Sequence, residues 1–161
     1  LLLLGSTVAS LAGSRWAAER AGNGASVGGG LPPLDLALHR LLVDVVVELV
    51  TGGAVSGVHD VSDGGLGVAL AEMAVHSATG LVVGGIADHA ELFSESPSRV
   101  IVCAPDPDAI VGRARSAGLA VSELGIAGGD RLVVEGLVDL ALADLEHAWR
   151  STLPDRLADA R

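Results

Sequence analysis

The sequence contains no lysine and no tyrosine, and a single cysteine stands among its 161 residues. Without lysine the chain can form neither a Schiff base nor the lysine-containing phosphate loop of P-loop enzymes. The one cysteine, Cys103, excludes an internal disulfide and any cysteine-rich metal site. Because Cys103 lies in the apolar run 100–104, we expect it to be a small buried hydrophobic side chain.

Aromatic residues and long apolar runs are also scarce. Phe93, Trp16 and Trp149 are the only aromatic residues. A core must therefore be built from Leu, Val, Ile and Ala, as in sheets that are covered by helices. No run approaches the roughly 18 apolar residues of a membrane-spanning helix, and Leu1 to Leu4 lack the basic region of a signal peptide. We expect a cytoplasmic protein that does not contact membranes.

Basic residues are scarce: the sequence has 10 of them and 20 acidic residues, which gives a net charge of −10. Affinity for nucleic-acid backbones depends on Lys and Arg, so a nucleic-acid partner is not expected. Half of the residues are apolar, which is enough for the core of one domain. The 22 glycines cluster between apolar runs, a pattern typical of tight turns.

Short apolar runs alternate with amphipathic segments along the chain. We predict strands at 1–4, 55–58, 81–83, 99–104, 119–126 and 131–135, and helices at 36–51, 65–78, 88–93, 106–117 and 142–150. Asp35 is the predicted cap of the helix 36–51, and residues 128–130 are predicted to close a hairpin between the last two strands. The order of elements predicts an α/β (α+β) fold, a mixed β-sheet covered by helices.

The first part of the chain differs from the rest in composition. Residues 5–34 are rich in Gly, Ser and Ala and are predicted to be irregular. We therefore divide the chain into a strand with a Gly/Ser-rich loop at 1–34 and a module at 35–161. Within the loop, Trp16 is predicted to anchor the segment on the domain, and Arg15 to lie on the surface.

Residues 59–65, His-Asp-Val-Ser-Asp-Gly-Gly, join a predicted strand to a predicted helix. Gly64 and Gly65 at the helix start would allow close backbone approach and leave N–H groups free, and the helix dipole would make this turn an anion site. Asp60 and Asp63 are themselves anions. A phosphate could therefore bind beside them only with Mg²⁺ or another cation in between.

A structural interpretation of the same turn stays open. Ser62 or Asp63 would cap the helix, and the two glycines would only make the turn. His59 is predicted to be a hydrogen-bonded residue at the strand end and not a ligand.

A second polar segment, residues 93–99, reads Phe-Ser-Glu-Ser-Pro-Ser-Arg and leads into a buried strand. Its hydroxyl groups and Glu95 could bind a ribose or an amide substrate. The alternative is a solvated turn held by bonds between Ser side chains and the backbone.

Taken in order, several stretches resemble the phosphoribosylformylglycinamidine synthase family, in its small synthase-subunit form. The stretches are residues 3–14, 33–36, 59–74, 92–99 and the ending 145–154. The resemblance covers essentially the whole chain, and residues 59–74 together with 92–99 are its specific part. It implies the C-terminal module of the aminoimidazole ribonucleotide synthetase superfamily, in a subunit whose two halves repeat.

The resemblance implies an ATP-dependent ligase of purine biosynthesis. The family converts formylglycinamide ribonucleotide to formylglycinamidine ribonucleotide with ATP, Mg²⁺ and ammonia derived from glutamine. ATP phosphorylates the amide oxygen, and ammonia then displaces phosphate through an iminophosphate intermediate. A glutaminase subunit supplies the ammonia, and a small third subunit assists assembly.

Two residues depart from the family pattern, since Arg15 replaces a Glu and Pro97 replaces a Gln. In the family the first-half copy of the Glu-Ser-Gln loop contacts substrate, whereas this chain resembles the second-half copy. Glu95 and Ser96 therefore match substrate-loop positions by analogy only. The ATP and Mg²⁺ ligands of the family lie mostly in other modules, so neither catalytic nor metal-binding residues are predicted here.

Three functional hypotheses remain. The chain carries part of the ligase site, or it is a non-catalytic scaffold that braces the active half and docks partner subunits. A related superfamily enzyme, acting on selenophosphate or thiamine phosphate, is the third, and the Phe-Ser-Glu-Ser loop argues against it.

Overall fold

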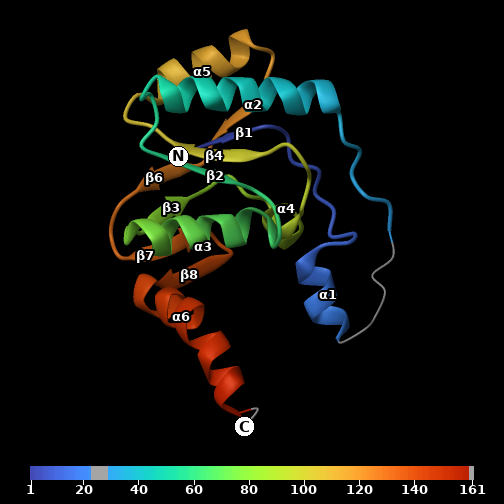
Figure 1. Ribbon diagram of the computed structural model, residues 1–161, viewed down its shortest axis with the longest axis vertical. Helices are drawn as coiled ribbons and strands as arrows, with labels where there is room; N and C mark the ends of the chain where they lie inside the picture. Colours follow the sequence, from blue (N-terminus) through green and yellow to red (C-terminus); the bar gives the residue numbers. More distant parts are fainter. Residues whose placement is uncertain (23–28, 160–161) are drawn as a thin grey trace.

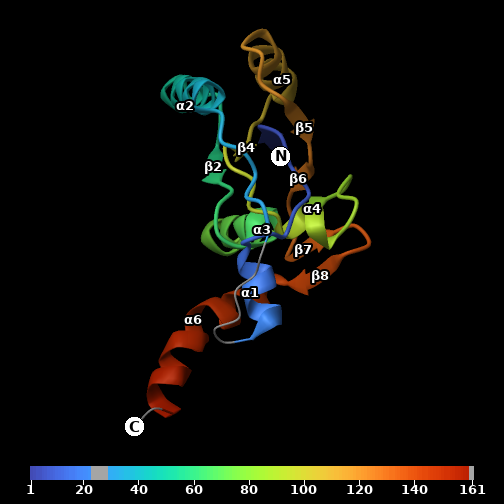
Figure 2. The same ribbon diagram turned by 90° about the vertical axis from the view of Figure 1, so that its right-hand side faces the viewer.

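The strands form two four-stranded sheets, where the sequence indicated one (Figures 1 and 2). The computed structural model describes residues 1–22 and 29–159. Sheet A has the order β2-β4-β1-β5 and is antiparallel throughout; its strands are β1 (Leu2–Leu4), β2 (Gly57–Asp60), β4 (Val100–Cys103) and β5 (Val121–Glu123). Sheet B has the order β6-β3-β7-β8; its strands are β3 (Leu81–Val83), β6 (Gly125–Ala127), β7 (Arg131–Val134) and β8 (Val138–Ala141).

Helices cover these sheets, so the predicted α/β (α+β) class is confirmed. They are α1 (Arg15–Ala21), α2 (Leu36–Thr51), α3 (Gly65–Ser77), α4 (His89–Phe93), α5 (Pro107–Ser116) and α6 (Leu142–Asp159). Figure 1 shows α2 and α5 together above sheet A, with α3 on the side of sheet B. No described helix combines the length and apolar character needed to cross a bilayer.

The helix α2 begins where the sequence predicted. The Asp35 side chain accepts hydrogen bonds from the N–H groups of Ala37 and Leu38 at 2.9 and 3.0 Å. Such a cap satisfies N–H groups that have no partner within the helix. The apolar stripe that follows, Leu42, Val45 and Leu49, is buried against sheet A.

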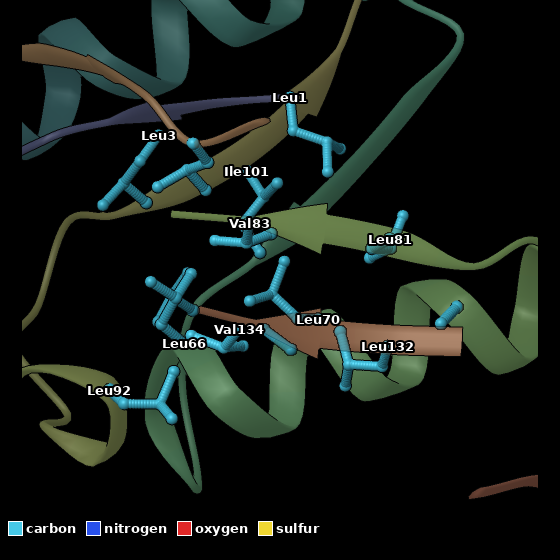
Figure 3. Packing of buried hydrophobic residues seen from close by; sticks show 14 residues of the cluster. Leu1, Leu3, Leu66, Leu70, Leu81, Val83, Leu92, Ile101, Leu132 and Val134 are labelled. Carbon is cyan, nitrogen blue, oxygen red and sulfur yellow. The ribbon is translucent and has the colours of Figure 1, made fainter. Parts of the chain in front are cut away.

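Strand β1 supplies both layers of the core because its side chains alternate between the two faces of sheet A. Leu2 and Leu4 pack with residues of α2 and α5. Leu1 and Leu3 face the other way and pack with α3 and sheet B (Figure 3). Burial of each leucine contributes about 2 kcal/mol, so this short central strand ties the two layers together.

The predicted hairpin around residues 128–130 is wrong. Strands β6 and β7 both pair with β3, which lies between them, and β3 and β7 run parallel. The hairpin joins β7 to β8, a strand that was not predicted. The predicted strand 119–126 is also divided, because the chain passes from sheet A to sheet B at Gly125. A Cβ on Gly125 would lie 2.0 Å from the carbonyl oxygen of Val82, so only glycine permits this crossing.

One helix was not predicted, and another is longer than predicted. Residues 5–34 were predicted to be irregular, yet α1 forms within them, and Ser14 caps it by accepting from the Ala17 N–H at 3.2 Å. The part of that prediction at 23–28 lies outside the described residues. The last helix was predicted to end at Arg150, but α6 continues through Pro154 to Asp159.

Candidate functional site at the Gly64 turn

The turn between β2 and α3 depends on two glycines with positive φ. Gly64 has φ +81° and Gly65 has φ +65°, values in the left-handed region that favours glycine. A Cβ on Gly65 would lie 2.4 Å from the carbonyl oxygen of Ser94. The turn therefore packs directly against the loop 93–99, and the two segments singled out from the sequence lie together.

The cap of α3 comes from this loop and not from the turn. Ser62 and Asp63 are exposed, and neither caps the helix, so that prediction is wrong. Instead, Oε1 of Glu95 accepts a hydrogen bond from the Gly64 N–H at 2.8 Å. The Gly65 N–H donates to the Ser62 carbonyl at 3.0 Å. Both glycine N–H groups that were predicted to face an anion are bonded within the chain.

The same carboxylate oxygen has a second donor. Oε1 of Glu95 accepts from the Arg15 N–H at 2.6 Å, at the start of α1. Negative charge is stabilising at helix N-termini, and hydrogen bonds to a charged acceptor are stronger than neutral ones. Glu95 thus joins the beginnings of two helices, α1 and α3.

Ser96 fastens the N-terminal segment at another point. Its Oγ accepts from the Val8 N–H at 2.9 Å and donates to the Val8 carbonyl at 3.1 Å. The side chain is 2% exposed. One hydroxyl therefore satisfies both backbone groups of Val8, much as a neighbouring strand would.

Arg99 holds the loop from inside. Its guanidinium donates to the carbonyl of Ser94 at 2.6 Å, to the carbonyl of Ser96 at 3.1 Å and to Oγ1 of Thr7 at 3.2 Å. The side chain is 2% exposed. Burial lowers the pKa of Arg99 to about 10, while the charges of Glu91 and Glu95 oppose that shift. The guanidinium therefore stays protonated at neutral pH and holds Thr7, Ser94 and Ser96 together as a buried positive charge. We call Glu95, Ser96 and Arg99, with the segments they hold, the clasp.

The carboxylates of the turn lie outside the clasp. The Asp60 side chain is 72% exposed, and Asp63 is exposed too. His59 bonds the Asp60 carbonyl through Nδ1 at 2.6 Å and approaches Glu72 at 3.2 Å through Nε2, so its predicted role as a hydrogen-bonded strand-end residue is confirmed. Across residues 1–22 and 29–159, no group of three His, Cys, Asp or Glu side chains could hold a metal ion.

Other single-residue predictions have mixed outcomes. Trp16 does anchor α1, since its ring lies 5.0 Å from that of His89. Arg15 is on the surface and pairs with Glu19 at 2.7 Å. Cys103, the last residue of β4, is only partly buried, although it packs against the core cluster of α3 and sheet B.

The burial of Arg99 was not predicted, because in the sequence this residue only ends the motif 93–99. A buried arginine needs acceptors around its guanidinium, and the backbone carbonyls of Ser94 and Ser96 supply two of them. The contacts with Thr7, Val8 and Arg15 each join residues that are at least 80 positions apart in the chain. No local pattern indicates them.

Comparisons with known proteins agree with this architecture. The family model described as AIR synthase related protein, C-terminal domain, matches residues 1–136. The chain is 44% identical over 162 residues to the phosphoribosylformylglycinamidine synthase subunit PurL of Nocardioides sp., covering 98% of the chain and 21% of that protein. It is 38% identical over 157 residues to the subunit PurL of Caulobacter vibrioides, covering 96% of the chain and 21% of the relative. The chain therefore spans about a fifth of the length of these relatives.

Solved structures share the fold. Thermotoga maritima PurL in complex with FGAR superposes with a TM-score of 0.72 at 21% identity, over 90% of this chain and 27% of that one. The PurLQS structure from Thermotoga maritima gives a TM-score of 0.65 at 22% identity, over 90% and 25% of the two chains. At this level of identity the likeness concerns the fold alone.

Proposed function

Because the chain belongs to the family of AIR synthase related protein C-terminal domains, we propose that it works as a module of a phosphoribosylformylglycinamidine synthase subunit. The observation that carries this proposal is the 44% identity to the Nocardioides subunit over 98% of the chain. The whole enzyme would convert formylglycinamide ribonucleotide to formylglycinamidine ribonucleotide with glutamine-derived ammonia. In that subunit, residues 1–34 would form the connecting strand and loop, and residues 35–161 the C-terminal module.

Within such a subunit the module would brace and not catalyse. The turn with Asp60, Ser62, Asp63, Gly64 and Gly65 would border a silent site. Both glycine N–H groups of the turn already have partners, one of them the Glu95 carboxylate. Glu95 and Ser96, which match substrate-loop positions, are bonded to Arg15, Gly64 and Val8. These contacts support a scaffolding role.

ATP and Mg²⁺ would be held mainly by other modules of the subunit. The described residues do not fit an ATP–Mg²⁺ site of their own, because the anion position at Gly64 is filled by Glu95 and the two exposed carboxylates of the turn have no third ligand beside them. PurL structures from Thermotoga maritima include complexes with ATP and with ADP. A nucleotide in the whole enzyme is consistent with those complexes.

The partners of the whole enzyme would be a glutaminase subunit and a small third subunit. A PurLQS structure from Thermotoga maritima lends support to such an assembly. Purine biosynthesis of this kind would take place in the cytoplasm. Neither nucleic acid nor a membrane would be required, in line with the net charge of −10.

A chimera tests the proposed function. This chain replaces the matched fifth of the Nocardioides subunit, and the ATP- and ammonia-dependent formation of the amidine is measured beside the unmodified subunit. We expect the chimera to retain most of the activity, and the 161-residue chain alone to have none. A folded, inactive chimera would contradict the proposal, as would ATP-dependent turnover by the isolated chain.

Two substitutions in the same chimera separate bracing from a direct site role. Asp63→Ala removes an exposed carboxylate, and Glu95→Ala removes the cap of α3 and the contact with α1. Bracing predicts that Glu95→Ala lowers the melting temperature and leaves the rate per folded molecule unchanged, while Asp63→Ala changes neither. A lower rate per folded molecule at an unchanged melting temperature, in either variant, would instead favour a direct role in the ligase site.

A further inference from the structure

The last helix leaves the body of the module. Its first half packs against α3, and its second half projects away from the rest of the described chain in both views (Figures 1 and 2). Three large apolar side chains follow one another along it at intervals of four residues. Trp149 is 53% exposed, Leu153 is 67% exposed and Leu157 is 60% exposed. Residues four apart lie on one face of a helix, so these side chains form a single stripe.

The stripe continues into a groove between α3 and α6. The groove has a volume of about 260 Å³, and its walls are Val68, Ala71, Glu72 and Val75 of α3 and Leu145, Ala148 and Trp149 of α6. The Trp149 ring also packs against the His76 ring, with the two ring centroids 5.7 Å apart and the ring planes at 86°. Stripe and groove meet at Trp149 and together make one mostly apolar surface, the α3–α6 surface. An exposed apolar surface that includes a Trp is typical of an interaction site.

The family boundary indicates what kind of partner this surface has. The family model ends at residue 136, before α6 begins at Leu142. The similarity to the Nocardioides subunit nevertheless covers 98% of the chain, so it includes most of α6. The helix therefore accompanies the long subunits and is not a part of the common domain. Nearly four-fifths of such a subunit lies outside the matched part, which supplies ample chain to cover the surface.

We propose that the α3–α6 surface is the docking site for an amphipathic helix from the remainder of the same long subunit. A groove between two helices suits a third helix, with apolar side chains three or four residues apart. Trp149 would be the anchor, and Leu153 and Leu157 would extend the contact beyond the body. This inference rests on the proposed function, because it requires the longer subunit.

Hydrogen exchange measured by mass spectrometry tests the proposal. Peptides covering 152–159 are followed in the isolated chain and in the Nocardioides chimera. We expect exchange to be at least about tenfold slower in the chimera, because docking removes these amides from solvent. Leu153→Asp in the chimera should restore the fast exchange. Ile126→Asp is the matched control, since Ile126 is 69% exposed on β6, and it should leave the protection intact.

Every outcome of this experiment either supports the docking site or contradicts it. Equal exchange in the isolated chain and the chimera overturns the docking site, as does protection that survives Leu153→Asp. Protection in the isolated chain that grows with concentration, with a doubled mass, also overturns it and identifies a second copy as the occupant. Amidine formation is read in the same samples. An active chimera with an unprotected helix defeats only the docking site, whereas an inactive chimera with a protected helix defeats only the proposed function.

Discussion

Two regions of the molecule reverse the ordinary rule of apolar inside and polar outside. Among the described residues, the buried polar side chains are Ser14, Ser94, Ser96 and Arg99, and all lie in or beside the clasp. The α3–α6 surface does the opposite and exposes apolar side chains such as Trp149 and Leu153. The two regions differ in whether their unusual side chains are satisfied by contacts within the chain.

The clasp is complete within the chain. In residues 1–22 and 29–159 no buried side-chain nitrogen or oxygen lacks a hydrogen-bond partner. A buried polar group with partners is tolerated, and one without them is destabilising. The apolar side chains along α6, in contrast, stay exposed and are not covered by the rest of the described chain. The module is therefore self-sufficient at its polar centre, whereas the proposed docking site would make one end depend on the longer subunit.

Arg99→Met should have the largest effect on stability. It removes the donor for the carbonyls of Ser94 and Ser96 and leaves both buried, which we expect to lower the free energy of unfolding by about 4 kcal/mol. Urea denaturation measures this loss. Arg115→Met, at an exposed position, is the control and should stay within about 0.5 kcal/mol of the parent. Equal losses for the two variants would show that the clasp does not depend on its guanidinium.

Gly65→Ala should come next, and Gly129→Ala is its control. Both positions have positive φ, +65° and +76°, so both variants share a backbone penalty of about 1 to 2 kcal/mol. Only Gly65 has a neighbour in the way, the Ser94 carbonyl at 2.4 Å, whereas a Cβ on Gly129 meets nothing within 4 Å. We expect a total loss of about 3 kcal/mol for Gly65→Ala. Thermal unfolding that gives the same loss for both would mean that the turn does not pack on the loop.

Ser96→Ala should have a smaller and more local effect. Two hydrogen bonds to Val8 disappear, and about 1.5 kcal/mol of stability should be lost. The Val8 amide should exchange faster with solvent, as measured by NMR. Ser116→Ala removes an exposed bond to Gly112 and should change stability little. An unchanged Val8 amide would contradict the contact.

The smallest expected effect concerns an ion pair at the surface. Arg113 of α5 bonds Glu48 of α2 and lowers the pKa of Glu48 from its ordinary 4.5. A lowered carboxyl pKa stabilises the fold above the ordinary value, and this contribution is lost as pH falls through the lowered pKa. Glu48→Gln should therefore lose stability less steeply than the parent on acidification from about pH 5 to 3. If the stability of the parent and of Glu48→Gln fell in parallel with pH, the ion pair would contribute nothing to the acid dependence.

Local sequence signals predicted much of this architecture. The Asp35 cap, the helix 36–51 and the strand 1–4 rest on residues next to one another in the chain, and each appears where the pattern indicated. The motif at 59–65 also identified the family. What failed was set by distant contacts. The place of β3 between β6 and β7 depends on pairing across about 50 residues, which no turn signal reports.

The candidate site shows the same division. Periodicity and glycine placed a turn at residues 64–65, and that turn exists. The origin of its cap could not be predicted, because Glu95 is 31 residues from Gly64. A Ser or Asp beside the helix start was the reasonable local choice. The chain instead used a carboxylate that reaches a second helix as well.

Amide exchange in Glu95→Ala tests most directly whether one carboxylate joins the two helix starts. The N–H groups of Arg15 and Gly64 both donate to Glu95 Oε1. Loss of a charged acceptor should speed exchange of both amides by about tenfold or more, while the amide of Val133, in sheet B, stays unchanged. Glu95→Gln should restore part of the protection. Faster exchange at only one of the two amides, or at neither, would contradict the shared clasp.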